Sequence, residues 1–257
     1  MNQQVIKLAQ ITDPHLHADR GALMRGVNTC DTLEAVLQQI MRGSRRPDAI
    51  IATGDLVQDE TRDGYRRFAK MLKPLGAPVY CLPGNHDSPD IMREQLNEAP
   101  FQFCGTASIG NWQLLMLNTH AENDNGGQFS ADQLTAIDDD LAACRDKHAI
   151  VFLHHHPIPM GSRWLDVVGL RQSQEFMEIV SSYAQVRAVV WGHVHQASDH
   201  LQNDIRMIST PSTCSQFLPN SNNFTMDTLP PAYRWLHLHP EGNIDTGIVW
   251  LESAKSV

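Results

Sequence analysis

The sequence lacks the long apolar runs and the leader segment that membrane and secreted proteins carry. None of its apolar stretches approaches the roughly 18 consecutive residues that a membrane-spanning helix needs. The first residues contain no basic region and pass directly into an expected strand, so we expect no secretory signal. These two absences predict that a membrane is not among the partners of this chain.

Cysteine is scarce, and its spacing excludes two common uses of thiols. The five cysteines are odd in number and never occur in Cys-x-x-Cys spacing; they are Cys30, Cys81, Cys104, Cys144 and Cys214. Scattered thiols of this kind argue against a disulfide framework and against a thiolate zinc site. We therefore expect reduced thiols and a cytoplasmic location.

Basic charge is scarce as well, since 20 lysines and arginines stand against 29 aspartates and glutamates. The formal charge of -9 argues against a nucleic acid polymer as partner, although local charge can still hold a small phosphate ligand. Hydrophobic residues make up 42% and charged residues 19% of the 257 residues, which is typical of a globular protein with a substantial core. What the sequence has in excess is histidine, with 13 residues.

The clearest local signal is the stretch from Val79 to Asp87. Its apolar residues 79–82 predict a short buried strand, and Pro83-Gly84 then ends it in a sharp turn. The turn presents an amide, an imidazole and a carboxylate in succession, and Ser88-Pro89 behind it predicts the start of a helix. This order of strand, polar turn and helix brings reactive groups to the carboxyl edge of a sheet in α/β folds.

Four other expected strands also end in turns that carry Asp, Asn or His. The strands are 5–11, 49–52, 149–153 and 187–191. With the first stretch, the turns carry Asp13 and His15; Asp55; Asn85 and His86; His154, His155 and His156; and His193 and His195. Each turn alone has an ordinary explanation, because Gly-Asp and a lone His are common after strands. Together they would crowd carboxylates and imidazoles at one sheet edge, which is costly unless a metal compensates.

The remaining pattern predicts one domain over residues 1–257. Helical spacing follows a capping-box variant at Asp31–Glu34 and a capping box at Ser130–Gln133, and it recurs near 65–75, 89–96 and 174–183. After about residue 200, the segments 205–209, 233–238 and 245–250 are expected strands with no helix between them. We therefore expect an α/β fold, with β/α layers over about 1–200 and an all-β cap over about 201–257.

The donor types indicate which metals would bind. Oxygen and nitrogen donors without thiolates suit zinc, manganese, iron or cobalt, and a carboxylate such as Asp55 can bridge two ions. Two ions roughly 3.5–4 Å apart are typical of phosphoryl-transfer sites.

Five motifs resemble those of the metallophosphoesterase (calcineurin-like) superfamily, and they occur in the same order. They are Asp13-Pro14-His15, Gly54-Asp55, Gly84-Asn85-His86-Asp87, His155-His156-Pro157 and Gly192-His193-Val194-His195. The resemblance implies a four-layer αββα sandwich. The chain is further similar to bacterial class III cyclic-AMP phosphodiesterases. The segments that carry this closer similarity are Gly26–Thr29, the triple-His stretch with Trp164-Leu165-Asp166, Thr210–Cys214 and Asn223–Thr225.

Position by position, the resemblance implies two divalent ions, Fe²⁺ or Mn²⁺ first, with Zn²⁺ or Co²⁺ as alternatives. One ion would be bound by Asp13, His15, Asp55 and His195, and the other by Asp55, Asn85, His155 and His193. The extra His154 leaves a one-residue ambiguity at the fourth motif.

The resemblance also implies a reaction, the hydrolysis of 3′,5′-cyclic AMP to 5′-AMP by a metal-bridging hydroxide. His86 would act as general acid or charge stabiliser over the phosphate, with Asp87 orienting its ring. The residues implied to contact the substrate are His15, Asp55, Asn85, His86 and His195.

Two alternatives stay open at this point. A broad phosphodiesterase acting on glycerophosphodiesters or other nucleotide esters would use the same metal centre. A non-catalytic metal-dependent scaffold would be expected to have lost ligands, and here none is missing. We further expect His17 and His156 to be supporting or packing residues, His120 to be a surface residue and Trp164 to be an aromatic anchor. A homo-oligomer is left open.

Overall fold

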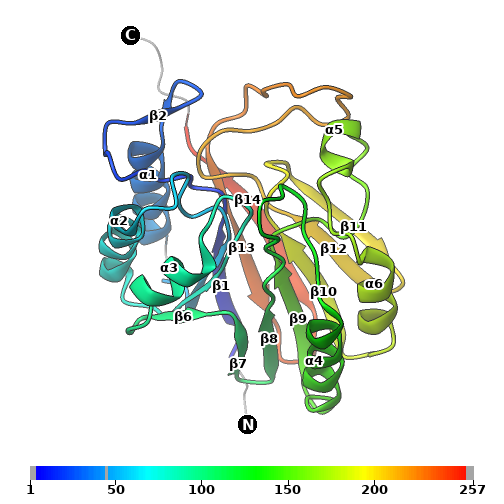
Figure 1. Cartoon of the computed structure of the whole chain (residues 1–257). Helices are drawn as coiled ribbons and strands as arrows, with labels where there is room; N and C mark the ends of the chain where they lie inside the picture. The colour runs from blue at the N-terminus through cyan, green and yellow to red at the C-terminus, as the bar shows by residue number, and fades with distance from the viewer. Residues whose placement is uncertain (1–3, 44–45, 253–257) are drawn as a thin grey trace.

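The computed structural model describes residues 4–43 and 46–252. Two six-stranded sheets pack face to face, and helices cover the outer face of each, so the molecule has four layers (Figure 1). This arrangement is the α/β sandwich that the sequence predicted. No helix within the described ranges combines the length and apolar character that crossing a bilayer requires.

The first sheet contains both the earliest and the latest strands of the chain. Its order is β14 (Ile244–Trp250), β13 (Ala232–Leu238), β1 (Ile6–Ile11), β4 (Ala49–Thr53), β5 (Val79–Leu82) and β6 (Phe101–Phe103). Strands β1, β4, β5 and β6 are parallel, whereas β13 runs antiparallel to β1 with Ile6 opposite Leu238. Its outer helices are α1 (Thr29–Arg42), α2 (Arg62–Leu72) with the 3-10 turn η1 (Lys73–Leu75), and α3 (Pro89–Gln95).

The second sheet repeats this plan with the middle of the chain. Its order is β11 (Ser198–Gln202), β12 (Ile205–Ser209), β10 (Val186–Trp191), β9 (His148–Leu153), β8 (Trp112–Met116) and β7 (Gly105–Ile109). Strands β8, β9, β10 and β12 are parallel. The helices on this side are α4 (Ala131–Ala142), the short α5 (Arg163–Asp166) and α6 (Ser173–Ser181), and a small hairpin of β2 (Leu23–Met24) and β3 (Val27–Asn28) precedes α1.

Three apolar clusters hold the layers together. The cluster between the sheets includes Leu8, Ile51, Trp112, Phe152 and Val190. A second cluster lies under α1, α2 and α3, and a third under α4 and α6. Because the central strands are buried on both faces, their sequences are mostly apolar rather than strictly alternating.

Helix α1 begins earlier than the sequence predicted. Asn28 is its N-cap, and the Asn28 side chain accepts a hydrogen bond from the backbone N–H of Asp31. Asn caps as well as Asp does, so the capping box that we expected at Asp31 is wrong. The box at Ser130 is confirmed, with reciprocal bonds between Ser130 and Gln133.

The residues after about 200 contain strands and no helix within the described part of the chain, as expected. They complete the two sheets rather than forming a layer over them, because β12 pairs with β10 and β13 pairs with β1. The expectation of one domain over 1–257 stays a prediction.

Candidate metal centre

The structure brings the five motif turns together at one edge of the two sheets. Asp13 and His15 follow β1, Asp55 follows β4, Asn85 and His86 follow β5, His154 to His156 follow β9, and His193 and His195 follow β10. Contacts cross between the two sheets: Nε2 of His195 lies 3.2 Å from Oδ1 of Asp13, and Nε2 of His154 lies 3.5 Å from Oδ1 of Asp55. The parallel strands therefore deliver all the predicted site residues to one region.

The backbone at these turns is strained. Five of the candidate ligands have positive φ, namely Asp13 (53°), His15 (46°), Asp55 (50°), His193 (63°) and His195 (48°). This region costs a residue with a Cβ roughly 1–2 kcal/mol, and such strain collects at functional sites. Both ends of the Asp-x-His turn and of the His-x-His turn have this unusual conformation. The positions required of the side chains, rather than the preferred φ of these residues, therefore determine the backbone here.

His15 and His195 present two lone pairs to each other. The Nδ1–H of His195 donates to the carbonyl oxygen of Ser215 at 2.6 Å, and that of His15 donates to Oε1 of Gln58 at 2.8 Å. These bonds assign the hydrogen of each ring to Nδ1, so both Nε2 atoms carry lone pairs, and they lie 3.2 Å apart. Two lone pairs at that distance, beside an Asp13 Oδ1 without a hydrogen-bond partner, suit a shared cation.

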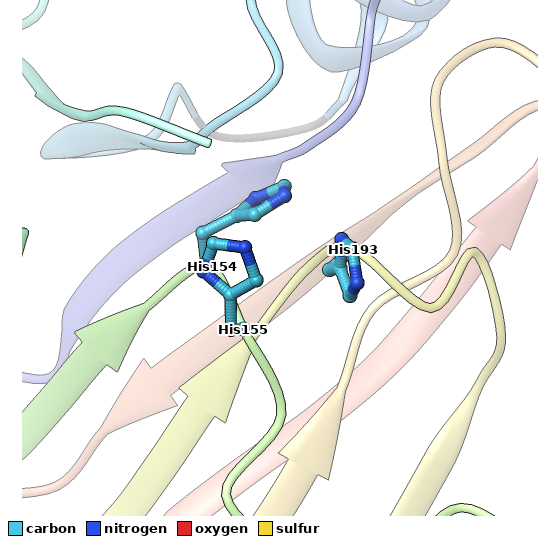
Figure 2. A group of neighbouring side chains, drawn as sticks. All are labelled: His154, His155 and His193. Atoms are coloured by element: carbon cyan, nitrogen blue, oxygen red, sulfur yellow. The ribbon is translucent and has the colours of Figure 1, made fainter. Parts of the chain in front are cut away.

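A second group consists of His154, His155 and His193, whose imidazoles lie together beyond the ends of β9 and β10 (Figure 2). The Nδ1 of His155 is hydrogen-bonded to the Thr119 hydroxyl at 2.8 Å. The Nε2 atoms of His155 and His193 are buried and have no hydrogen-bond partner. Buried polar atoms are rarely left unpaired, so these two also suit a cation.

His154 and His155, either of which could be the metal ligand of the fourth motif, both lie in this group. His154 donates from Nδ1 to the carbonyl oxygen of Thr53 at 2.7 Å, and its Nε2 lies 3.2 Å from Oδ1 of Asn85. His155 instead offers the unpaired Nε2. Each places one ligand atom within 4.8 Å of that of His193, so the choice of His155 stays a prediction.

The Asp55 carboxylate favours a positive charge beside it, whereas burial keeps two of the surrounding imidazoles neutral. Burial raises the pKa of Asp55, but His154 and His15 outweigh this effect and hold that pKa well below its usual value. Burial lowers the pKa of His154, yet the Asp55 carboxylate beside it raises the value to about 9. Burial lowers the pKa of His15 to about 3 and that of His193 well below 6.5, which keeps these two imidazoles neutral and able to ligate.

His86 is held by Gln58, a residue that sequence reasoning missed. The Gln58 amide accepts from His15 through Oε1 and donates from Nε2 to Nδ1 of His86 at 3.1 Å. This bond assigns the His86 hydrogen to Nε2. A glutamine three residues after Asp55 has no distinctive spacing, and only the fold shows that it joins two motifs.

Asp87 does not orient the His86 ring, so this part of the prediction requires correction. Its carboxylate accepts from the backbone N–H groups of Leu56, Val57 and Gly84 and from the Tyr65 hydroxyl, at 2.9–3.1 Å. Burial, with the charge of Asp55, raises the pKa of Asp87 to about 7 against these donors. Asp87 therefore ties together the turns after β4 and β5.

Comparison with known proteins identifies this arrangement. The sequence profile of the family described as Calcineurin-like phosphoesterase matches residues 6–197. The chain belongs to this family. It is 40% identical over 252 residues to the 3′,5′-cyclic adenosine monophosphate phosphodiesterase CpdA of Haemophilus influenzae, covering 98% of this chain and 92% of that protein. Its identity to the CpdA of Pseudomonas aeruginosa is 38% over 243 residues, covering 95% and 89%.

The fold of this phosphoesterase also matches a solved structure. A dimetal phosphatase from Danio rerio superposes with a TM-score of 0.69 at 14% identity, covering 96% of this chain and 99% of that one. At this identity the match establishes the fold alone. The family, together with the His and Asp clusters, supports two divalent ions in the phosphoesterase.

A cavity of about 610 Å³ opens beside the metal centre of the phosphoesterase, with Asn85 and His86 in its wall. His120, which we expected at the surface, lines the same cavity and is half-buried. A larger cavity of about 720 Å³ lies between α1 and α2, but none of the candidate site residues lines it.

Aromatic residues support the other side of the centre. Phe217 stacks on His195 with ring centroids 4.1 Å apart, and Trp164 packs against Phe217 at 5.1 Å. His156 stacks on His193 at 5.7 Å. These contacts agree with the expected roles of Trp164 as an anchor and His156 as a packing residue.

Proposed function

We propose that this phosphoesterase is a binuclear-metal phosphodiesterase that hydrolyses 3′,5′-cyclic AMP to 5′-AMP. The observation that carries the proposal is the 38–40% identity, over at least 95% of the chain, to proteins named as cyclic AMP phosphodiesterases. The complete set of motif ligands at one sheet edge supports the same activity.

In this proposal one ion is held by Asp13, His15, Asp55 and His195, and the other by Asp55, Asn85, His155 and His193. Asp55 shares one candidate ligand group with His15 and another with Asp13 and His154, and His154 also belongs to the group of His155 and His193, which supports a position of Asp55 between the two ions. When bound, two divalent ions would neutralise phosphate oxygens and supply a nucleophilic oxygen near neutral pH. Nitrogen and oxygen ligands support Fe²⁺ or Mn²⁺, with Zn²⁺ or Co²⁺ as alternatives.

The role that we assign to His86 is stabilisation of the negative charge that develops on the leaving oxygen. Because Gln58 donates to Nδ1, the His86 hydrogen is on Nε2, where it can reach a ligand in the cavity. As the bond from phosphorus to the ribose 3′ oxygen breaks, the leaving oxygen accepts a hydrogen bond from this Nε2–H and takes a proton from water, which makes it the 3′ hydroxyl of 5′-AMP while the imidazole keeps its hydrogen. The proposed substrate contacts are His15, Asp55, Asn85, His86 and His195.

Two further parts of the proposal rest on general features. All five cysteines are free thiols, which supports a cytoplasmic location. The intact ligand set disfavours a non-catalytic scaffold, while a broad phosphodiesterase remains the main competing function. A homo-oligomer is compatible with the proposal, and no nucleic acid polymer or membrane is required by it.

The deciding experiment is hydrolysis of cyclic AMP by enzyme that has been stripped with a chelator and reloaded with Mn²⁺ or Fe²⁺. We expect metal-dependent release of 5′-AMP and no 3′-AMP. Rapid cleavage of an aryl phosphodiester without any turnover of cyclic AMP would overturn the substrate and favour the broad phosphodiesterase. Full metal loading with no turnover of either ester would favour the scaffold.

A further inference from the structure

The cavity beside the metal centre is acidic although a phosphate ester is expected to enter it. Five acidic residues line it, namely Glu60, Asp87, Asp90, Glu122 and Asp124, and no lysine or arginine of the described residues does so. A site for anionic ligands usually carries opposite charge, because complementary charge raises the local ligand concentration. These carboxylates therefore need an explanation.

Three of the five are compensated, and the first is Asp87, which is buried and accepts four hydrogen bonds. Asp124 forms an ion pair with Arg171, and Asp90 lies 3.6 Å from Arg93. Glu60 and Glu122 are exposed, and neither has an ion-pair partner within residues 4–43 and 46–252. The uncompensated negative charge of the wall comes from these two residues.

Both charges act on the same side chain inside the cavity. Burial lowers the pKa of His120, and the charges of Glu60, Asp55 and Glu122 oppose that shift. Glu60 also has a positive φ of 52°, a conformation that costs a residue with a Cβ about 1–2 kcal/mol. Strain at an exposed residue of the cavity wall indicates that the position of this carboxylate matters to the site.

The proposed reaction changes the charge of the ligand in this cavity. A phosphodiester carries one negative charge. The product is a phosphate monoester whose second pKa is about 6, so it carries two negative charges at pH 8. Coulomb energy is proportional to ligand charge, so Glu60 and Glu122 repel the product twice as strongly as the substrate.

We propose that Glu60 and Glu122 form an electrostatic filter that selects monoanionic diesters and expels dianionic ligands, including the product. This inference rests on the proposed function, because the charge difference is that between cyclic AMP and 5′-AMP. The filter lowers inhibition by product and disfavours substrates that carry an additional phosphate.

The test compares metal-loaded wild type with the double variant Glu60→Gln/Glu122→Gln at pH 8. At about 10 mM ionic strength, where the Debye length is about 30 Å, we expect the inhibition constant of 5′-AMP to fall about tenfold and the KM of cyclic AMP about threefold. The factor for 5′-AMP is about the square of the factor for cyclic AMP. The reason is that the charge of 5′-AMP is twice as large, which doubles the Coulomb energy. Both changes should disappear at about 1 M salt.

The matched control is Glu175→Gln/Glu178→Gln, which removes the same charge from the outer helix α6, where both side chains are exposed. We expect it to leave both constants unchanged. The filter would be overturned if the KM of cyclic AMP and the inhibition constant of 5′-AMP changed by the same factor. It would also be overturned if the control variant had the same effect, or if the effect persisted at high salt.

A chromogenic pair keeps this test separate from the choice of substrate. Thymidine 5′-(4-nitrophenyl phosphate) and its 3′-phosphorylated analogue share one scissile bond and differ only in the second phosphate. Wild type should prefer the unphosphorylated ester, and the double variant should reduce that preference about tenfold at low salt. If cyclic AMP is not hydrolysed but this ratio changes, the proposed function fails and the filter stands.

Discussion

The Gln58 side chain contacts two histidines that have different proposed roles. Its amide accepts from His15, a proposed metal ligand, and donates to His86, the proposed charge stabiliser. An amide has one accepting and one donating end, so this orientation fixes both ring tautomers together. A metal-ligating His commonly depends on such an outer partner for its orientation.

We expect Gln58→Met, which keeps the length of the side chain and removes the amide, to lower kcat about 10–100-fold. The KM should change less, because the lost bond fixes the His86 hydrogen rather than a direct substrate contact. Steady-state kinetics with metal analysis of the same samples would measure this. Gln38→Met on the exposed face of α1 is the control, and an unchanged kcat in Gln58→Met would refute the positioning role.

The two proposed roles in the Gly-Asn-His-Asp turn predict different losses. Asn85→Ala should lose one of two ions and nearly all turnover, because it removes a proposed ligand. His86→Ala should retain both ions and lose about 10²–10³-fold in rate, the usual cost of removing one hydrogen-bond donor to the developing charge. Metal content by mass spectrometry beside kcat separates the two. Full occupancy with an unchanged rate in His86→Ala would contradict its assignment.

At the scale of elements, Asp87 joins the turns that follow two neighbouring strands. One carboxylate receives backbone N–H groups from Leu56 and Val57 after β4 and from Gly84 after β5, and α2 adds the Tyr65 hydroxyl. These turns also carry Asp55 and Asn85. Their relative position therefore depends on a side chain that does not touch the His86 ring.

Asp87→Asn should reduce the free energy of unfolding by about 3 kcal/mol. The amide nitrogen cannot accept, so buried N–H groups would be left without a partner. Denaturant unfolding of the metal-free protein would measure the loss. Asp90→Asn, three residues along on the exposed surface of α3, should change stability by less than about 0.5 kcal/mol. Equal stability of the two variants would show that the hydrogen bonds of Asp87 contribute nothing.

The elements that the sequence predicted are those whose signal is local. Strand β9 and strand β10 are predominantly apolar, and their ranges differ by one residue from the expected ones. The edge strand β11, with sequence SDHLQ, is mostly exposed and polar, so only its pairing with β12 makes it a strand. Gln58 and Asp87 could not be interpreted from the sequence for the same reason, because most of their hydrogen-bond partners are far away along the chain.

For the whole molecule, buried polar contacts run from the first sheet to the metal centre. Arg234 on β13 donates to Thr210, Thr210 donates to Gln10, and Gln10 donates to Thr53, whose carbonyl accepts from His154. Stability and metal binding are therefore expected to be coupled across the molecule.

Chelation of the metal-loaded enzyme should lower its melting temperature. One site saturated at 100 times its dissociation constant contributes about 2.7 kcal/mol, which corresponds to about 5–10 °C for a chain of this size. Calorimetry before and after chelation measures the shift, and readdition of Mn²⁺ should reverse it. Identical melting curves would contradict metal binding by the folded protein.

The pairing of β1 with β13 has a consequence for biosynthesis. A ribosome releases β1 first, yet the strand beside it belongs to residues 232–238. At about 5–20 residues per second, the nascent β1 waits roughly ten to forty seconds for that neighbour. Until then its open edge is exposed to other chains. The Asp13 turn and the His195 turn can therefore come together only late in translation. Metal binding would follow once nearly the whole sequence has been synthesised.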